Sequence, residues 1–219
     1  MKWSGEGVMK SKTVLVLAPH TDDAELGCGA SIARFVEEGS DVFIAAFSSA
    51  EESLPLGAPK DLLKQEFYKA IPLLGVKKEN TAVYDYQVRR LSYFRQEVLE
   101  EMVKLKKQIQ PDMVLLPSGQ DVHQDHQVIH MEGLRAFKDN TILGYELPWN
   151  HVTFSTQAFI VVEEHHLNKK YLALNEYRSQ MELERPYFTR DFLFGLARVR
   201  GTQIKEKYAE AFEVIRIKI

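Results

Sequence analysis

The sequence predicts an α/β fold with a Rossmann-like, mostly parallel sheet that is flanked by helices on both faces. Short apolar runs rich in Val, Ile and Leu alternate with longer amphipathic stretches, which is the pattern of strand and helix units in a parallel sheet. Runs such as TVLVLA are apolar throughout, as strands buried on both faces are. The 219 residues, 45% hydrophobic and 27% charged, have ordinary globular composition and suit one domain spanning residues 1–219.

The first part of the chain alternates three apolar runs with two amphipathic stretches. Residues 13–18 and 41–47 are apolar runs of strand length, and residues 81–84 form a weaker one. Between them, residues 26–38 and 60–74 carry apolar side chains at helical spacing, and a glycine follows each stretch as a helix stop. We therefore expect strand, helix, strand, helix and strand in this order.

The second part continues the alternation. Residues 93–110 have apolar side chains at helical spacing, and the apolar run MVLL at 113–116 is short enough for a buried strand before Pro117. The remaining expected elements are a helix at 125–137, strands at 141–145 and 159–163, helices near 169–181 and 189–199, and a final strand at 212–217.

Composition, charge and the cysteine count bear on the partner, the redox environment and the location of the protein. The formal net charge of -3, without a lysine-rich tract, lacks the basic field that nucleic-acid binding needs, so a small-molecule partner is expected. The single cysteine, Cys28, excludes an intramolecular disulfide and a zinc-thiolate cluster and favours a reducing cytoplasm. The N-terminus lacks the apolar region of a secretory signal, and no apolar stretch approaches the roughly 18 residues of a membrane span. We therefore expect a cytoplasmic protein.

Two polar loops follow strands of the predicted sheet. PHTDD follows the run at 13–18, and SGQDVHQDH follows the run at 113–116. Open α/β sheets bind ligands beyond the carboxyl ends of their strands, so the two loops are expected to meet at one crevice.

These loops hold residue types that bind zinc in hydrolytic sites. Such sites take three protein ligands from His, Asp or Glu and leave a fourth position for water. His20 and Asp23 with one histidine of the second loop satisfy that count, and Asp22 is then a free carboxylate that can act as a general base. An aspartate after a strand is otherwise most often a helix cap. Spacing alone does not choose among the three candidates in the second loop, His123, His126 and His130.

The two loops resemble the motifs of a known family. PHTDDAELGCG resembles the P-H-x-D-D-x-E-x-G-x-G signature of the PIG-L/LmbE-like zinc-dependent de-N-acetylases, and HQDH resembles their second motif, usually H-P-D-H. The resemblance implies that His20, Asp23 and His126 are metal ligands, that Asp22 is the general base, that His123 polarises the amide or protonates the departing amine, and that Asp125 orients His123.

The chain departs from the family pattern at three places. Thr21 and Gln124 replace prolines of the two motifs, and neither position supplies a ligand. SSAEES replaces the Thr-x-Gly-Glu-like stretch after the second strand, which leaves Glu51 a weak candidate for substrate contact.

Other candidate side chains stand after later strands. Arg89 and Arg90 follow the third strand, and Tyr145, Trp149 and His151 are expected in a loop at the same end of the sheet. For each of these residues, substrate contact and a surface or packing role are both open.

A further expectation concerns the glycines beside Cys28, which indicate close packing of the first helix rather than a dinucleotide loop.

By resemblance, the expected enzyme is a zinc-dependent hydrolase that acts on a linear amide bond. It removes an N-acetyl or other N-acyl group from an amino sugar or sugar conjugate, with Asp22 taking the proton of a zinc-bound water. Fe²⁺ or another divalent metal fits the same ligand types, and the resemblance allows a homo-oligomer. Two alternatives stay open: a zinc amidase acting on a thiol-sugar conjugate, and a non-catalytic Rossmann-like module that binds a nucleotide or sugar. The carboxylate pair argues against the module, because phosphate binding has no use for it.

Overall fold

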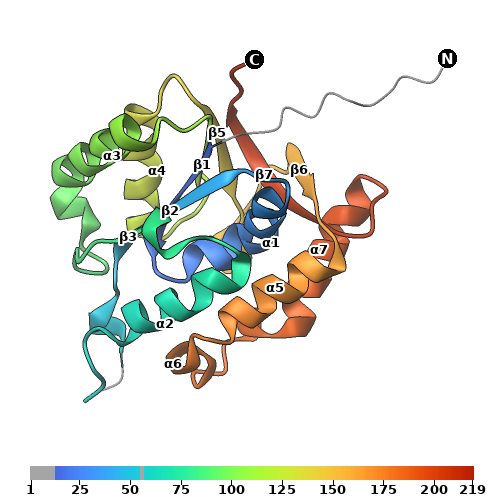
Figure 1. Cartoon of the computed structure of the whole chain (residues 1–219), viewed down its shortest axis with the longest axis horizontal. Helices are drawn as coiled ribbons and strands as arrows, with labels where there is room; N and C mark the ends of the chain where they lie inside the picture. Colours follow the sequence, from blue (N-terminus) through green and yellow to red (C-terminus); the bar gives the residue numbers. More distant parts are fainter. Residues whose placement is uncertain (1–12, 55–56) are drawn as a thin grey trace.

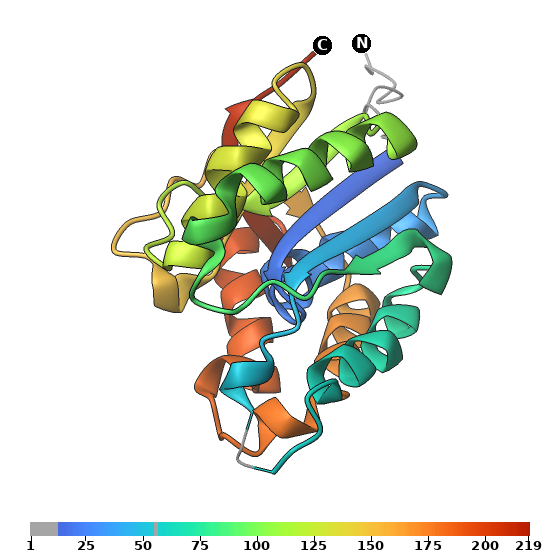
Figure 2. The ribbon, with the colours of Figure 1, turned by 90° about the vertical axis from the view of Figure 1, so that its left-hand side faces the viewer.

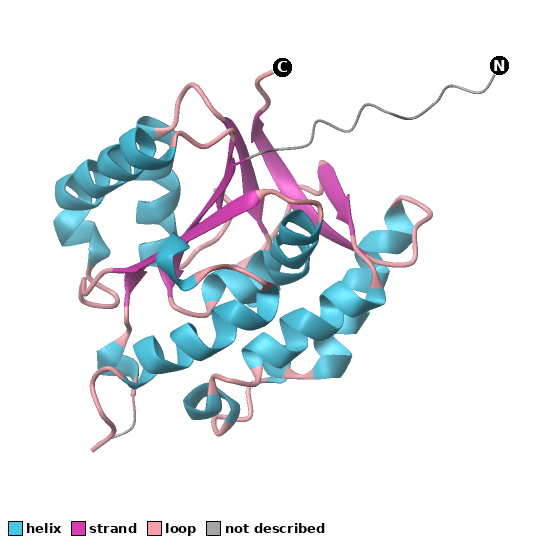
Figure 3. Ribbon diagram, viewed as in Figure 1, coloured by secondary structure: helices cyan, strands magenta, loops and turns pink. Residues whose placement is uncertain are grey.

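The computed structural model describes residues 13–54 and 57–219, and a seven-stranded sheet forms the centre of this part (Figures 1 and 3). The sheet order is β3-β2-β1-β4-β5-β7-β6. Strands β1 to β5 are parallel, and β7 runs antiparallel to β5 and β6. The predicted fold class is thus confirmed. The strands are β1 Thr13–His20, β2 Asp41–Ser48, β3 Thr81–Val83, β4 Met113–Pro117, β5 Thr141–Tyr145, β6 Ala158–Val161 and β7 Ala209–Arg216.

Helices cover both faces of the sheet. The α3 and α4 helices pack on one face, and α1, α2, α5 and α7 pack on the other (Figure 1). In the turned view, α3 (green) lies in front of the blue strands (Figure 2). The helices are α1 Asp23–Glu37, α2 Leu62–Ala70, α3 Arg95–Ile109, α4 Gln124–Ala136, α5 Glu164–Leu174, α6 Arg178–Met181 and α7 Arg190–Gln203, with 3₁₀ turns at Glu51–Ser53, Ile71–Leu74, Lys78–Asn80, Leu91–Phe94, Pro148–Asn150 and Pro186–Phe188.

Strand β1 is central because both of its faces are apolar. Val14, Val16 and Ala18 point into the core beneath α1, and Leu15 and Leu17 point into the core beneath α3 and α4. All five are fully buried. A continuous apolar run therefore makes a strand with a helix layer on each side, as the sequence predicts. Within the described residues, no helix combines the length and apolarity needed to cross a membrane.

Several helix boundaries differ from the expected ones, and two of them have a clear local cause. The expected helix at 60–74 ends at Ala70, and a 3₁₀ turn replaces its last part because Pro72 has no backbone N–H to donate. In place of the one helix expected near 169–181 the structure has two, α5, which begins earlier, at Glu164, and ends at Leu174, and the short α6. A capping box between Glu163 and His166 sets the start of α5.

The polar loop after β1 is shorter than expected. Helix α1 begins at Asp23 rather than at residue 26, so only Thr21 and Asp22 separate strand from helix. Asp23 therefore sits in the first turn of a helix, directly above the end of the central strand.

Helix α1 is interrupted at Cys28, whose φ of -146° and ψ of 26° are not helical. Just before it, Gly27 packs on the ring of Tyr145, where a Cβ atom would lie 2.3 Å from the ring carbon Cδ2. This close approach lets the Tyr145 hydroxyl donate to the carbonyl of Leu17 at 3.1 Å. The close packing expected here is thus present, with a strand residue as the partner.

Replacing Gly27 by alanine is expected to lower the free energy of unfolding by about 1–3 kcal/mol, because the buried Tyr145 ring has to move. Gly195 in α7 is the matched control, since nothing lies within 4 Å of an added methyl there. Gly195→Ala should raise the same free energy by about 0.5–1 kcal/mol through helix propensity. Urea denaturation measures both, and effects of the same sign would contradict the close packing at Gly27.

Candidate metal centre

A cavity of about 270 Å³ lies beyond the carboxyl ends of β1 and β4, which pair in parallel. The two polar loops meet there, as the sequence predicts. Segments far apart in the chain line the cavity: His20, Thr21, Asp22, Asp23, Leu26, Ala50, Ser53, Leu63, Val88, Arg89, His123, His126, Trp149, Asn150, Gln180, Arg185 and Tyr187.

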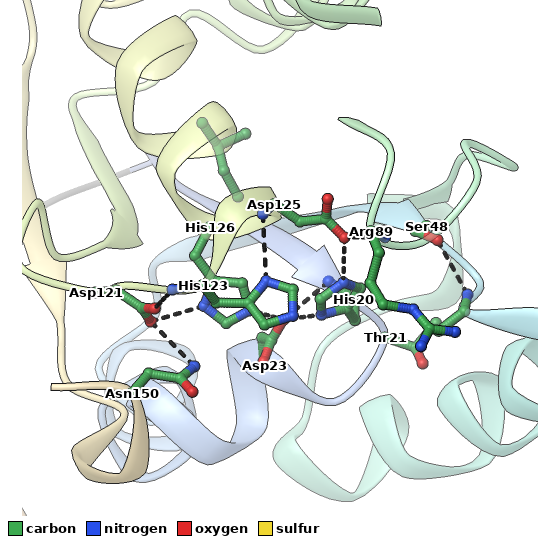
Figure 4. A network of polar contacts seen from close by, with 12 residues as sticks. His20, Thr21, Asp23, Ser48, Arg89, Asp121, His123, Asp125, His126 and Asn150 are labelled. Carbon is green, nitrogen blue, oxygen red and sulfur yellow. Dashed lines mark hydrogen bonds and ion pairs between the residues drawn. The ribbon is translucent and has the colours of Figure 1, made fainter. Parts of the chain in front are cut away.

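The carboxylate of Asp23 lies between two histidine rings (Figure 4). Its Oδ2 atom is 3.0 Å from Nδ1 of His20 and 3.3 Å from Nε2 of His126. In a tetrahedral zinc site with bonds of about 2.0–2.2 Å, two ligand atoms lie roughly 3.3–3.6 Å apart. The two distances from Asp23 to the histidines are therefore close to the spacing between neighbouring ligand atoms of a tetrahedral metal ion.

Carboxylates hold the outer nitrogens of both rings. Asp125 Oδ2 lies 3.0 Å from Nε2 of His20, and Asp121 Oδ2 lies 2.7 Å from Nδ1 of His126. A carboxylate only accepts, so without a cation both nitrogens of each ring carry protons, the inner ones facing Asp23. A cation bound beside Asp23 would replace the inner protons, and the outer protons would still face Asp125 and Asp121. Paired carboxylates of this kind orient metal-binding imidazoles in many proteins.

The same carboxylates set the charge of the rings. Burial alone would lower the pKa of His20, but the Asp23 charge and hydrogen bonds with Asp125 and Asp23 outweigh it and raise the pKa to about 10. The pKa of His126 rises to about 9 against burial, through Asp23 and Asp121. Although burial opposes it, the two histidines hold the pKa of Asp23 well below its ordinary value. The cluster thus favours two positive charges, which two ring protons or one divalent cation would supply.

A backbone contact determines which ring nitrogen of His123 carries the proton. Its Nδ1 accepts the N–H of Asp125 at 3.2 Å, at the start of α4, so Nε2 carries the proton of the neutral ring. Burial and the neighbouring His126 and His20 lower the pKa of His123 to about 4. One nitrogen of each of these three rings lies within 4.8 Å of the others. With its proton in place, Nε2 of His123 is a hydrogen-bond donor.

Asp22 occupies the N-cap position of α1, yet its side chain makes no capping hydrogen bond. It lines the cavity instead. Burial and the neighbouring Asp23 charge raise the pKa of Asp22 to about 6, and His20 and Arg185 partly oppose the rise. The helix-cap alternative therefore does not describe this carboxyl group, which lines the cavity beside Asp23.

The structure gives Asp125 a different contact from the one that the resemblance implies. Its carboxylate faces His20 rather than the ring of His123, and it also accepts the backbone N–H groups of Arg89 at 2.5 Å and Leu91 at 3.2 Å. His123 and Asp125 are two residues apart at the start of a helix, so their side chains point in different directions.

The third histidine of the second loop lies away from the cavity. Nδ1 of His130 is 2.9 Å from the carbonyl oxygen of Pro117, and its ring packs on Gly119. The choice among His123, His126 and His130, which spacing left open, thus rests on hydrogen-bond partners that only the folded chain provides.

A second group of metal-type donors, Glu37, His165 and His166, lies where the end of α1 meets the start of α5. There the backbone N–H of Glu163 donates to Nδ1 of His166 at 3.0 Å. Nε2 of His166 therefore carries the proton of the neutral ring, and it lies 3.4 Å from Glu37 Oε2. While this capping contact holds, His166 offers no lone pair to a metal.

Asp121 and Asn150 belong to the cluster, although the motifs do not single them out. The Asp121 carboxylate contacts His126 and accepts the backbone N–H of His123 at 2.9 Å and the side-chain amide of Asn150 at 3.3 Å (Figure 4). Asp121 lies inside SGQDVHQDH, but an aspartate in a polar loop is most often a turn residue, so its sequence signal is weak.

The other sequence candidates separate into two groups. Arg89 and Trp149 line the cavity, whereas Arg90 and Glu51 are absent from its described lining. Arg89 has a φ of 64°, a strained value for a side chain with Cβ, and its amide is held by Asp125. Such strain is common at functional sites.

The segment after β5 is only partly as expected. Trp149 stacks on Tyr187, with ring centroids 3.8 Å apart and planes 12° from parallel. Tyr145 is instead the last residue of β5 and fully buried, and His151 accepts the backbone N–H of Leu147 at 3.2 Å. Tyr145 and His151 therefore have structural contacts.

A buried hydrogen-bond chain supports the loop after β1. The Tyr177 hydroxyl oxygen is 2.7 Å from the Thr21 carbonyl oxygen and 2.6 Å from Oε1 of Glu25. The carbonyl only accepts, so Tyr177 donates its single proton to Thr21, and Glu25 must donate to the Tyr177 oxygen. Burial raises the pKa of Glu25 to about 8, in agreement with a neutral carboxyl group.

Two histidines and a carboxylate at a cavity, with a free carboxyl group beside them, are typical of metal-dependent hydrolases. Comparison with known proteins points the same way. A family profile described as PIG-L, GlcNAc-PI de-N-acetylase, matches residues 15–137, more than half of the chain. The chain therefore belongs to the PIG-L family of deacetylases, as its two motifs predict.

Individual relatives agree with this assignment. The chain is 29% identical to the uncharacterized deacetylase YaiS of Escherichia coli K12 over 176 residues, which cover 78% of this chain and 92% of that one. It is also 29% identical to the diacetylchitobiose deacetylase of Thermococcus kodakarensis over 135 residues, which cover 57% of this chain and 49% of that protein.

Solved structures share the fold. The conserved protein TT1542 from Thermus thermophilus superposes with a TM-score of 0.78 at 22% identity, over 94% of this chain and 95% of that one. The 4-carboxy-2-hydroxymuconate hydratase GalB of Pseudomonas putida KT2440 reaches 0.77 at 19% identity, over 95% and 98%. Because a hydratase has this architecture, fold alone does not choose the reaction.

Removing the Tyr177 hydroxyl tests the buried chain of hydrogen bonds. Tyr177→Phe should lower the free energy of unfolding by about 1–3 kcal/mol, because the Thr21 carbonyl and Glu25 lose their buried partner. Glu25→Gln should lower it far less, since a carboxamide N–H can donate to the Tyr177 oxygen as the neutral carboxyl group does. Urea denaturation near pH 7 measures both. An equal loss in the two variants would argue against a neutral Glu25.

Proposed function

We propose that this protein is a divalent-metal-dependent N-deacetylase, with Zn²⁺ as the metal. One observation carries the proposal: Oδ2 of Asp23 lies within 3.3 Å of the inner nitrogens of His20 and His126, whose outer nitrogens face carboxylates. His20, Asp23 and His126 would hold the cation. Fe²⁺ suits the same nitrogen and oxygen donors, and metal analysis of the purified protein distinguishes the two.

The cation, when bound, would supply Lewis acidity that acidifies a water molecule and polarises the amide carbonyl. Asp22 lines the cavity beside Asp23 and is not used as a helix cap, so it would accept the proton of the attacking water. His123 would donate the Nε2 proton in a hydrogen bond to the oxyanion. Transfer of the proton from Asp22 to the departing nitrogen then yields acetate and a free amine.

We further propose an N-acetylated amino sugar or sugar conjugate as the substrate. The similarity to a diacetylchitobiose deacetylase supports this class. So does the cavity wall, where the stacked Trp149 and Tyr187 offer an aromatic surface next to the polar side chains of Asn150 and Gln180. Acetate release from a panel of N-acetylated sugars, nucleotide sugars, glycosides and thiol-sugar conjugates tests this choice. Release from the thiol conjugates alone would favour the amidase alternative.

The organisation of the whole chain is part of the proposal. Residues 1–219 would form one deacetylase domain, although the family profile ends at residue 137, because β5, β6 and β7 continue the same sheet. A cytoplasmic location accords with the single buried Cys28, which is a free thiol.

Asp22→Asn tests the general base. We expect the variant to retain its metal and to release acetate about 10²–10⁴-fold more slowly, because an amide cannot accept the proton of water. The measurement is the turnover number on the best substrate of the panel, with metal content determined on the same sample. Turnover equal to that of the unchanged protein would remove Asp22 from this role.

A matched pair of histidine variants tests which rings bind the metal. His126→Ala should lose stoichiometric Zn²⁺, because it removes an inner nitrogen beside Asp23. His123→Ala should keep Zn²⁺ and lose turnover, because its ring presents a proton rather than a lone pair. Metal content after dialysis and acetate release are measured for both. Loss of Zn²⁺ in His123→Ala with retention in His126→Ala would reverse the assignment.

A further inference from the structure

At the Cys28 interruption of helix α1, side chains from two other elements form hydrogen bonds with backbone groups on both sides of the break. In an unbroken helix the N–H of Ala30 would donate to the carbonyl of Leu26. Instead, Ala30 N and Ser31 N donate to Oε1 and Oε2 of Glu210, at 3.2 and 2.7 Å. The carbonyl of Leu26 accepts from Nζ of Lys170, at 2.7 Å.

Lys170 and Glu210 also pair with each other, with Nζ 2.6 Å from Oε1. Both side chains are buried, at 4% and 6% exposure. Lys170 comes from α5 and Glu210 from β7, which both contact α1 (Figure 1). A single ion pair thus spans the interruption, with one partner on each broken end.

The direction of the pair matches the electrostatics of the two helix segments. The first segment ends in carbonyl groups with partial negative charge, and the ammonium group lies there. The second segment begins with N–H groups of partial positive charge, and the carboxylate lies there. A buried ion pair of this kind costs desolvation, so plain stability is a weak reason for its presence.

Only residues 23–27 of α1 precede the interruption, and this short segment carries Asp23. Asp22 adjoins its start, and Gly27 at its end packs on Tyr145. One helical turn would fray alone, because helices this short are marginal in water. Nζ of Lys170 holds the far end of this segment through its hydrogen bond to the Leu26 carbonyl.

We infer that Lys170 and Glu210 are positioning residues for the metal centre: their ion pair bridges the interruption of α1 and holds the turn that presents Asp22 and Asp23. The inference rests on the proposed function, because it takes Asp23 to be a metal ligand. Both residues lie beyond residue 137, outside the segment that matches the family profile.

Single substitutions test whether the pair positions the ligand. In the full-length protein, Glu210→Gln and Lys170→Met should each weaken Zn²⁺ binding about tenfold, because the turn that carries Asp23 loses its support; the size is that of losing a group that orients a metal ligand. Zn²⁺ affinity is measured by competition with a chromogenic chelator, and urea denaturation is measured on the same variants. Leu105→Ala is the control, because Leu105 is buried in α3 on the other face of the sheet. It should lower stability and leave Zn²⁺ affinity unchanged.

The outcomes separate this inference from the proposed function. If the unchanged protein binds no Zn²⁺, the result contradicts both the proposed function and the positioning inference. If it binds Zn²⁺ and both Glu210→Gln and Lys170→Met bind it equally well, only the positioning inference falls. An equal loss of affinity in Leu105→Ala would also overturn it, because lost stability alone would then explain the effect.

Exchanging the two partners tests the direction of the charges. The double variant Lys170→Glu with Glu210→Lys keeps an ion pair but places the carboxylate at the Leu26 carbonyl and the ammonium at the N–H groups of Ala30 and Ser31. We expect it to bind Zn²⁺ no better than the single variants. Recovery of the affinity of the unchanged protein would show that any ion pair suffices and would overturn the inference.

Discussion

The parallel pairing of β1 with β4 is the constraint on which the candidate site depends. The two strands end at the same edge of the sheet, so the turn after β1 and the loop after β4 become neighbours. His20 and Asp125, 105 residues apart in sequence, then lie in hydrogen-bond contact. A slip of one residue in this register would turn side chains of β1 toward the opposite face and separate His20 from Asp125.

Charge compensation is the second constraint. Asp23, Asp121 and Asp125 are buried, and buried carboxylates are costly unless positive groups or hydrogen bonds meet them. His20 and His126 stand between these carboxylates and supply that charge as imidazolium ions when no cation is present. The arrangement that makes the folded cluster stable is thus the arrangement that would attract a divalent cation.

The part of the chain beyond the family match builds the surroundings of the motif residues. Tyr177 supports the loop after β1, Lys170 and Glu210 span the interruption of α1, and Trp149 and Tyr187 form the cavity wall. The motifs bring the reactive groups, and the later elements hold them and shape the space for a ligand.

The sequence by itself determined the order of strands and helices, the placement of both polar loops at the carboxyl edge and the family. These depend on local periodicity, on Gly and Pro at element ends and on two motifs, all of which are written in short stretches. Element boundaries near Pro72 and Glu163 were less accessible, because a missing N–H and a capping contact decide them.

Only the tertiary structure decided how the site residues are used. Whether a histidine offers a lone pair or a proton depends on what its other nitrogen contacts, and for His20, His123 and His126 those partners are Asp125, a backbone N–H and Asp121. The contact of Asp125 with His20, and the ion pair across the interruption of α1, likewise join residues distant in sequence. No local pattern encodes such contacts, because they exist only once the sheet has brought its loops together.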